Sequence, residues 1–430
     1  MSFSLALDLG ASFIKGVRVA DDGTVIGEAV RAPSPPGKPL DGVGSRIIPA
    51  QELLAAVQTV LSRIDPRSEG RLYAFSNQMH GFVFVDQDLG AAYGPVTWQD
   101  QRGHEALGDL RASLGEEGVR RLGNELRTGI PLATLASQRG RFRPGSGLVL
   151  ASIGDWVAWS LAGGKGPIHA TNAAAMGLMD VQAGCWDPQA VELAGLDSEQ
   201  LPEISGDVVT IGGHSRPCCL TPVGDQQAAL LGIGVGRSEM SFNVATGAQV
   251  ARVADRGDGT EAQVRPFFDQ RFLHTVTHIP AGRALNAWLG LLTELSEGDA
   301  SLEDQWDRVI ERSRQRERSD MKFNLALFDS ADGLTGSVRN ILEDDLTVGE
   351  FMGAALARLA ESLAFHAGRV GWDGVDTAVY SGGWLREGRL VGESLASQLP
   401  VPVRRHPDHE DALAGLRKLI AQHLLEGDPS

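Results

Sequence analysis

The sequence predicts a mixed α/β protein made of two lobes, and three observations support this expectation. The chain has 430 residues, enough for two or three domains of ordinary size. Stretches with strand and helix periodicity alternate along it. A strand–turn–strand pattern near the N-terminus recurs, with a similar sequence, from residue 240. We expect the boundary near residue 235, which gives one lobe from 1 to 235 and another from 236 to 430.

The first lobe is expected to open with a β-meander. Leu5, Leu7 and Leu9 alternate with polar or small residues, and Gly and Ala then turn the chain before a second apolar run. Residues 33–46 are rich in Pro and Gly and predict an irregular surface segment. Three further elements are expected in this lobe: a helix at 51–64 and buried strands at 72–75 and 82–85.

The second lobe is expected to begin like the first. The segment MSFNVATGAQVARVADRGDGT aligns with SLALDLGASFIKGVRVADDGT, which starts at Ser4. The likeness arises either by chance or from two copies of one ancestral fold that each present a hairpin to a shared cleft. The remainder predicts, in order, a loop and short strand over 324–345, an amphipathic helix over 347–370, a strand at 377–380, a helix, a strand at 401–403 and a closing helix from about 411.

Composition limits the classes of partner and compartment. Lys and Arg number 39 against 55 Asp and Glu, a net charge of −16, and no basic block occurs, which argues against a nucleic-acid or anionic-membrane partner. The three cysteines form no Cys-x-x-Cys pair, so neither a disulfide framework nor a zinc site is predicted. The N-terminus lacks signal-peptide character and no apolar run is long enough to cross a bilayer. We therefore expect a cytoplasmic, reduced protein.

The first turn of the meander is a candidate phosphate and metal site. Asp8 ends a predicted buried strand, and Gly10, Ser12 and Lys15 follow it. A carboxylate there can hold Mg²⁺, while turn amides, the Ser12 hydroxyl and the Lys15 ammonium can face phosphate oxygens. The alternative is an ordinary strand–turn–strand with an incidental acid.

Two polar runs downstream are candidates for binding a sugar. Gln78-Met79-His80 follows a predicted strand, where open α/β sheets bind ligands, and its amide and imidazole can bond hydroxyls. Trp98-Gln99-Asp100-Gln101-Arg102 combines an aromatic face with planar polar groups, which suits a carbohydrate. The alternatives are a satisfied core or turn histidine at His80, and a helix start with a surface ion pair between Asp100 and Arg102.

Three later segments complete the set. Asp225 lies between Gly224 and a small-residue helix start, where it is either an N-cap or a general base kept ionised by the helix dipole. Thr246-Gly247 can form a second hydroxyl–glycine turn against phosphates. Gly382-Gly383 can let the adenosine of a nucleotide approach the backbone, because glycine has no Cβ.

Taken together, these motifs resemble the FGGY family of carbohydrate kinases over nearly the whole chain, with most likeness to sedoheptulose kinases and then to xylulose kinases. The resemblance implies a two-lobed actin-like (RNase H-like) ATPase fold with a central ligand cleft. It implies that Asp225 is the catalytic base and Asp8 the Mg²⁺ ligand. It also implies that the first lobe binds the sugar and carries one of the phosphate-binding turns, and that the second lobe binds the nucleotide of ATP.

Three departures from the family pattern accompany this resemblance. Ala11 stands where many members have threonine, Leu327-Phe328-Asp329-Ser330 replaces a Gly-x-Arg-type loop, and the chain is shorter than many members. The expected reaction is phosphoryl transfer from MgATP to a ketose hydroxyl of sedoheptulose or of xylulose or another pentulose. A non-catalytic sugar or nucleotide sensor and an actin- or chaperone-like ATPase are the competing hypotheses. The sequence leaves a homodimer open.

Overall fold

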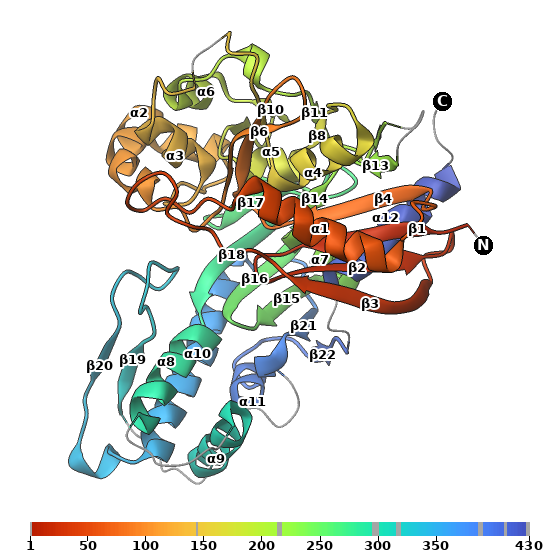
Figure 1. Ribbon diagram of the computed structural model, residues 1–430. Helices are drawn as coiled ribbons and strands as arrows, with labels where there is room; N and C mark the ends of the chain where they lie inside the picture. The colour runs from red at the N-terminus through yellow and green to blue at the C-terminus, as the bar shows by residue number, and fades with distance from the viewer. Residues whose placement is uncertain are drawn as a thin grey trace.

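The computed structural model describes residues 2–142, 145–212, 217–294, 301–314, 320–385, 390–407 and 411–426. The described chain forms two lobes, each built on a mixed sheet with helices packed around it (Figure 1). Elements of the first half lie in the upper part of Figure 1, and most of the second half lies below them.

The first sheet has the strand order β12-β13-β4-β1-β2-β3, with β14 paired to β4. Its strands are β1 (Ser4–Leu9), β2 (Phe13–Val19), β3 (Val25–Pro33), β4 (Leu72–Asn77), β12 (Thr210–Ile211), β13 (Cys218–Leu220) and β14 (Val223–Gly224). The opening β1–β2–β3 meander is antiparallel, as predicted, and β4 runs parallel to β1. The carboxyl ends of β1 and β4 therefore meet at one edge of the sheet.

Helix α1 (Ala50–Ile64) covers part of this sheet because its apolar residues share one face. Leu53, Val57 and Ile64 are buried at helical spacing. The helix lies so close to β2 that a Cβ on Gly16 would sit 2.6 Å from Val60 Cγ1. The predicted helix at 51–64 is thus confirmed to within one residue.

The second sheet repeats the connectivity of the first. Its strands are β15 (Glu239–Val244), β16 (Gly247–Ala254), β17 (Gln263–Pro266), β18 (Phe272–Pro280), β21 (Thr377–Ser381) and β22 (Val403–Arg405). The run β18-β16-β15-β21-β22 has the same relative strand directions as β3-β2-β1-β4-β13. The shared topology favours two copies of one fold over chance likeness.

One polar pair recurs at equivalent positions of the two sheets. Ser76 Oγ of β4 donates to Asp8 Oδ1 of β1 at 2.9 Å. In the second sheet, Asn243 Nδ2 of β15 donates to Ser381 Oγ of β21 at 2.8 Å. Asp8 and Asn243 each lie one residue before the end of their strand. Only the first copy therefore carries a carboxylate at this position.

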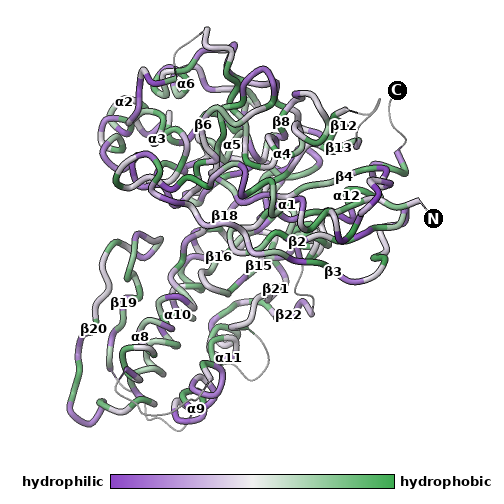
Figure 2. Tube along the Cα trace, in the orientation of Figure 1, coloured by the Kyte–Doolittle hydropathy of each residue, from purple (hydrophilic) through white to green (hydrophobic). Residues whose placement is uncertain are grey.

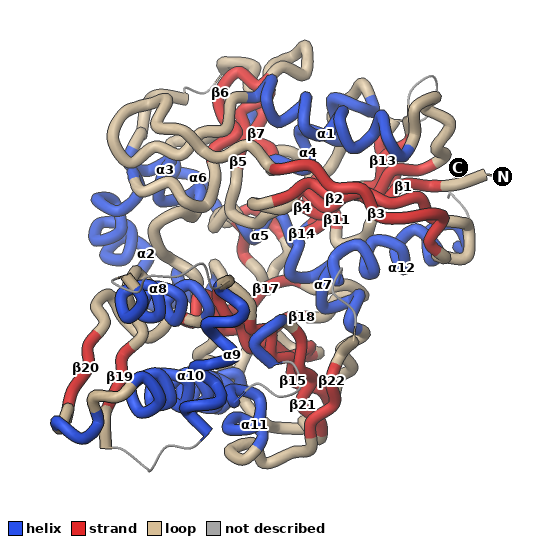
Figure 3. Tube along the Cα trace, turned by 60° about the horizontal axis from the view of Figure 1, so that its bottom comes forward, coloured by secondary structure: helices blue, strands red, loops and turns tan. Residues whose placement is uncertain are grey.

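Helices α7 (Asp225–Ile233) and α12 (Asp411–Glu426) lie between the two sheets (Figure 3). Their buried apolar residues form one cluster with residues of both sheets, such as Val17 and Val379. The helix backbones approach very closely, since a Cβ on Gly415 would lie 1.9 Å from the Ala228 carbonyl oxygen and one on Gly232 would lie 1.9 Å from that of Asp411. Glycine at both positions permits this crossing.

The remaining elements flank the two sheets. In the first half they are β5 (Phe82–Val85), β6 (Ala91–Val96), β7 (Val149–Ala151), α2 (Leu107–Arg121), α3 (Pro131–Ser137), α4 (Ile153–Ala162), α5 (Ala170–Ala175), α6 (Pro188–Ala194) and the short strands β8 (Ile168–His169), β9 (Met179–Asp180), β10 (Cys185–Trp186) and β11 (Ile204–Ser205). In the second half they are α8 (Gly282–Thr293), α9 (Leu302–Arg314), α10 (Val348–Val370), α11 (Leu390–Ala396), β19 (Lys322–Asn324) and β20 (Ser337–Arg339). Hydrophobic residues line central strands such as β4, whereas the outer helix α9 is largely hydrophilic (Figure 2).

Most expected elements of the second half are present, with shifted ends. Helix α10 confirms the amphipathic helix, and β22 lies two residues beyond the predicted strand. The helix expected between Gly383 and the next strand is present as α11, which begins at Leu390, and a 3₁₀ turn at Gly383–Leu385 precedes it. Within the described part, no helix has the length and apolar character needed to span a membrane. The boundary at residue 235 stays a prediction, because α12 packs against first-half elements.

Candidate active site

Each predicted phosphate turn connects the two strands of a hairpin, and the two hairpins occupy equivalent positions in the two sheets. Gly10 to Ser12 join β1 and β2, and Ala11 and Ser12 are exposed. Thr246 lies in the turn between β15 and β16, and Thr246 and Gly247 are exposed. The Thr246 carbonyl accepts from the backbone N–H of Arg283 at 2.8 Å, which ties this turn to the start of α8. Exposed turn amides of this kind are suited to binding phosphate oxygens.

Asp8 lies next to the expected base. Its side chain is 9% exposed at the end of β1, and its Oδ1 is held by Ser76. Lys15 faces Asp8 across the β1–β2 ladder. No cluster of three or more His, Cys, Asp or Glu side chains suited to a metal occurs among the described residues. This donor set fits Mg²⁺ better than a transition metal, because Mg²⁺ is commonly held by one or two carboxylates together with phosphates and water.

Asp225 is the first residue of α7 and is half-buried. Gly224 occupies the N-cap position, so Asp225 does not cap the helix through the N-cap geometry. Its Oδ1 accepts from the backbone N–H of Gln226 at 2.8 Å. Burial and then the negative charge of Asp8 raise the pKa of Asp225 to about 7. A carboxyl group with this pKa can take up a proton near neutral pH.

Gly382 and Gly383 follow β21, and the first is confined by the backbone. Gly382 has φ +86°, and a Cβ there would lie 2.3 Å from the Val244 carbonyl oxygen. A Cβ on Gly383 would meet no described atom within 4 Å. The pair therefore combines a close approach to β15 with open space over the backbone, which is compatible with a flat ligand against this segment.

His80, expected to bind sugar, is held by the protein on both ring nitrogens. Its Nδ1 lies 2.8 Å from the Ala175 carbonyl oxygen, which can only accept, so Nδ1 carries the proton. Nε2 then accepts from Arg265 Nη2 at 3.4 Å. Burial, with the nearby arginines, lowers the pKa of His80 to about 3, so the ring is neutral. His80 is therefore a histidine whose two ring nitrogens are both bound within the protein, which is the alternative considered for it from the sequence.

Gln78 is placed differently from His80. Its side chain is 4% exposed, and its amide has no hydrogen-bond partner within the described ranges. A buried amide with free donor and acceptor capacity at the end of β4 can bind a hydroxyl of a ligand. Gln78 therefore keeps the binding capacity that His80 uses internally.

Asp100 and Arg102 form a buried ion pair rather than the surface pair considered as their alternative role. Asp100 is 1% exposed and accepts from Arg102 Nη2 at 2.7 Å and from the Arg46 backbone N–H at 2.9 Å. Arg102 also donates to the Tyr93 hydroxyl at 2.7 Å and contacts Asp41. These bonds fix the segment that carries Trp98.

Trp98 lines a cavity of about 290 Å³ that is formed by residues of both halves of the chain, most of them of polar type. Its ring meets that of His278 edge to face, with centroids 6.1 Å apart. Asn124 and Thr128 contribute from the first half. From the second half, Asp329 of the segment 327–330 also lines the cavity.

A second ionic group, which the sequence analysis did not single out, lies behind this cavity. Glu125 binds Arg265 through two hydrogen bonds of 2.8 and 3.1 Å, and Arg127 Nε lies 3.4 Å from the same carboxylate. Arg265 and Arg127 hold the pKa of Glu125 well below its usual range, although burial opposes this. His80 and His278 both have left-handed backbones, with φ of 61° and 60°, a strain often found at functional sites. Nothing in the short β17 sequence, Gln-Val-Arg-Pro, marks Arg265 as part of a site.

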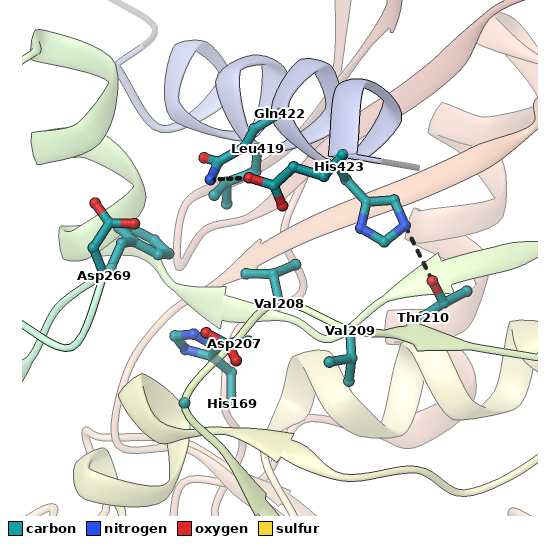
Figure 4. Close-up of a pocket in the computed structure, with 12 residues that line it drawn as sticks. His169, Asp207, Val208, Val209, Thr210, Asp269, Leu419, Gln422 and His423 are labelled. Atoms are coloured by element: carbon teal, nitrogen blue, oxygen red, sulfur yellow. Dashed lines mark hydrogen bonds between the residues drawn. The ribbon is translucent and has the colours of Figure 1, made fainter. Parts of the chain in front are cut away.

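A larger cavity of about 590 Å³ lies elsewhere. It is bordered by the loop before β12, the turn between β17 and β18, and α12 (Figure 4). His423 of α12 and Thr210 of β12 are joined by a hydrogen bond of 3.1 Å at its edge. None of the predicted site residues lines it. Size alone therefore does not identify the site.

Comparison with known proteins identifies the family of this chain. Residues 3–217 match the N-terminal domain of the FGGY family of carbohydrate kinases. The chain belongs to this family. It is 30% identical over 255 residues to a glycerol kinase of Gloeobacter violaceus, covering 54% of this chain and 49% of that protein. An apulose kinase of Pectobacterium atrosepticum is 26% identical over 276 residues, 57% of this chain and 53% of its own. This FGGY chain thus spans about half the length of the curated relatives it matches.

Solved structures confirm the two-lobed actin-like fold along the whole chain. A gluconate kinase from Lactobacillus acidophilus superposes with a TM-score of 0.84 at 17% identity, over 99% of this chain and 90% of that one. A xylulose kinase from Rhodospirillum rubrum gives a TM-score of 0.84 at 16% identity, over 100% and 91% of the two chains. At such identities the likeness concerns the fold.

Proposed function

We propose that this FGGY protein transfers the terminal phosphoryl group of MgATP to a hydroxyl of a ketose, with sedoheptulose as the first candidate and xylulose or another pentulose as the alternative. The observation that carries the proposal is the placement of Asp225. This carboxyl group begins α7 beside Asp8, and its pKa of about 7 suits a general base at neutral pH. Family membership and names of relatives such as apulose kinase support a sugar or polyol acceptor.

In this proposal Asp225 accepts the proton of the attacking hydroxyl. The start of α7 favours the ionised form of Asp225, while burial and Asp8 oppose it. Its pKa therefore stays near neutral pH, where the carboxyl group can both accept and release a proton. Asp8 would hold Mg²⁺, and Lys15 and the turns at Gly10 to Ser12 and Thr246 to Gly247 would face the phosphates. The adenosine would lie over Gly382 and Gly383. When bound, Mg²⁺ neutralises charge on the phosphoryl oxygens.

The acceptor is proposed to lie between Gln78 and Trp98. Gln78, which does not itself line the Trp98 cavity, offers a buried amide, and Trp98 offers an aromatic ring in a cavity whose other lining residues are mostly of polar type. This combination of a flat apolar surface with several hydrogen-bonding groups suits a polyhydroxylated compound. In the same proposal Met79 and His80 form the wall behind the acceptor, and Asp100 and Arg102 hold Trp98 in place.

The test is a coupled ADP-release assay with MgATP across sedoheptulose, xylulose, ribulose, gluconate and glycerol. ADP production that depends on one of these compounds would support the proposal and identify the acceptor. If no compound elicits ADP while ATP or a sugar still raises the melting temperature, the protein is a sensor built on the kinase fold and the proposal is wrong.

A further inference from the structure

The guanidinium of Arg265 lies at the junction of four chain segments. Its side chain is 5% exposed. Nε and Nη2 donate to the two oxygens of Glu125, at 3.1 and 2.8 Å. Nη1 donates to Gln226 Oε1 and lies 3.4 Å from Met79 Sδ, and Nη2 lies 3.4 Å from His80 Nε2. Arginine has five N–H donors, so these contacts account for all of them.

These contacts join the second half of the chain to both sides of the proposed site. Arg265 comes from β17, whereas Met79 and His80 follow β4 and Gln226 belongs to the first turn of α7. Met79 is the neighbour of Gln78, and Gln226 is the neighbour of Asp225. The planar guanidinium of Arg265 therefore touches Met79, which follows the proposed acceptor-binding Gln78, and Gln226, which follows the proposed base Asp225.

Further bonds fix the same hairpin against the first half. Gln226 Nε2 donates to Thr275 Oγ1 of β18 at 3.0 Å, and Gln227 Nε2 donates to the Pro266 carbonyl at 3.2 Å. The Val264 N–H donates to the Gly123 carbonyl at 2.9 Å. The amide of Gln226 is thus bound at both ends, so its side chain is committed to holding α7 in place rather than to a ligand.

We propose that Arg265 is a positioning residue for phosphoryl transfer, and that its guanidinium sets the spacing between the acceptor-binding end of β4 and the base at the start of α7. The inference rests on the proposed function. It follows from geometry, because an arginine with all donors occupied cannot bind the acceptor itself but restricts the residues on either side of it. Displacement of a reacting group by about 1 Å can lower turnover by roughly 100-fold.

The decisive variant is Arg265→Lys, which keeps the positive charge beside Glu125 but loses the planar fork. We expect turnover to fall about 10- to 100-fold, with the KM for MgATP and the melting temperature little changed. The matched control is Arg271→Lys in the same hairpin, whose guanidinium binds Asp269 and the Phe268 carbonyl instead. This control should keep wild-type kinetics.

A second variant separates positioning from structural support. Glu125→Met combined with Arg265→Met removes both buried charges together, so no unpaired charge is left to destabilise the fold. A folded double variant with turnover lowered at least as far as in Arg265→Lys supports the inference. Wild-type turnover in either variant overturns it while the proposed function stands. No acceptor-dependent ADP from the wild-type protein overturns both.

Discussion

At the scale of single residues, the proton affinity of Asp225 makes the proposed chemistry sensitive to pH. Burial removes the water that would stabilise the carboxylate, and the charge of Asp8 disfavours a second negative charge beside it. Both effects raise the pKa, and the carboxylate form is the one that can accept the hydroxyl proton. Activity should therefore rise, not fall, as the pH rises through this pKa.

We expect kcat/KM for the acceptor to increase with pH along a limb centred near pH 7. A pH–rate profile at subsaturating acceptor measures it, because this quantity reports the pKa values of the free enzyme. Asp225→Asn should lower turnover by about 10²- to 10⁴-fold while leaving the melting temperature within a few degrees. An active Asn variant would remove Asp225 from the role of base.

The sequence predicted residues that follow strand ends but not the partners they meet. Asp8, Gln78 and Asp225 could be found because each comes at the end of a buried strand or the start of a helix, and parallel strands bring such ends together. Glu125 and Arg265 lie 140 residues apart, and nothing local in either segment specifies their pairing. The partners of His80 were equally hidden, since Ala175 and Arg265 come from distant parts of the chain.

At the scale of elements, α10 supports the second-half wall of the cavity. Asp332 follows the cavity-lining segment 329–331 and is joined to α10 by Ser362 Oγ at 2.8 and 2.9 Å and by His366 Nε2 at 2.8 Å. The Ala331 N–H donates to the His278 carbonyl at 3.0 Å. Burial alone would raise the pKa of Asp332, but the hydrogen bonds from His366 and Ser362 outweigh it and hold the pKa below its usual range.

We expect Asp332→Asn to lower the free energy of unfolding by about 1–3 kcal/mol at neutral pH, because buried partners lose a charged acceptor. A depressed pKa stabilises the fold above the unfolded value of about 4, and this contribution is lost as the pH falls through the folded value. Urea midpoints of both proteins between pH 7 and 3 measure it, and the difference should shrink on acidification. A difference that is constant with pH would mean that Asp332 acts through packing rather than charge.

Element prediction succeeded where a segment carries its own periodicity. Helix α10 was predicted because its apolar residues recur on one face over more than twenty positions. The three-residue strand β22 was placed two residues early, since its position is defined by the β21 residues with which it pairs. The burial of α12 could be expected from its pattern, but the pattern does not say that the helix returns to the first half.

At the scale of the whole molecule, α12, the last described helix, contacts both the middle and the beginning of the chain. Beyond the glycine contacts, Lys418 Nζ donates to the Leu231 carbonyl at 2.8 Å, and Arg417 Nε donates to the Gly23 carbonyl at 2.8 Å. In this way the last described helix holds both the helix that begins with Asp225 and the turn between β2 and β3. The position of the base therefore depends on residues nearly two hundred positions away.

We expect Gly415→Ala to lower the free energy of unfolding by about 1–3 kcal/mol, because the new methyl group would overlap the backbone of α7. Gly368→Ala in α10 is the matched control, since a Cβ there would meet nothing within 4 Å and alanine favours a helix by about 0.5–1 kcal/mol. Urea denaturation measures both. If the two variants were equally stable, the helices would not be in the close contact described here.

The same crossing has a consequence for the order of events on the ribosome. Residues of the first sheet and α7 are synthesised long before α12, so the apolar face of α7 that α12 covers stays exposed while the second half is made. In a nascent chain that stops short of residue 411, the helix that carries the proposed base would lack the packing of α12 against it. Newly made protein should therefore gain activity in a single late step, and chaperones that bind exposed apolar surface should associate with it until then.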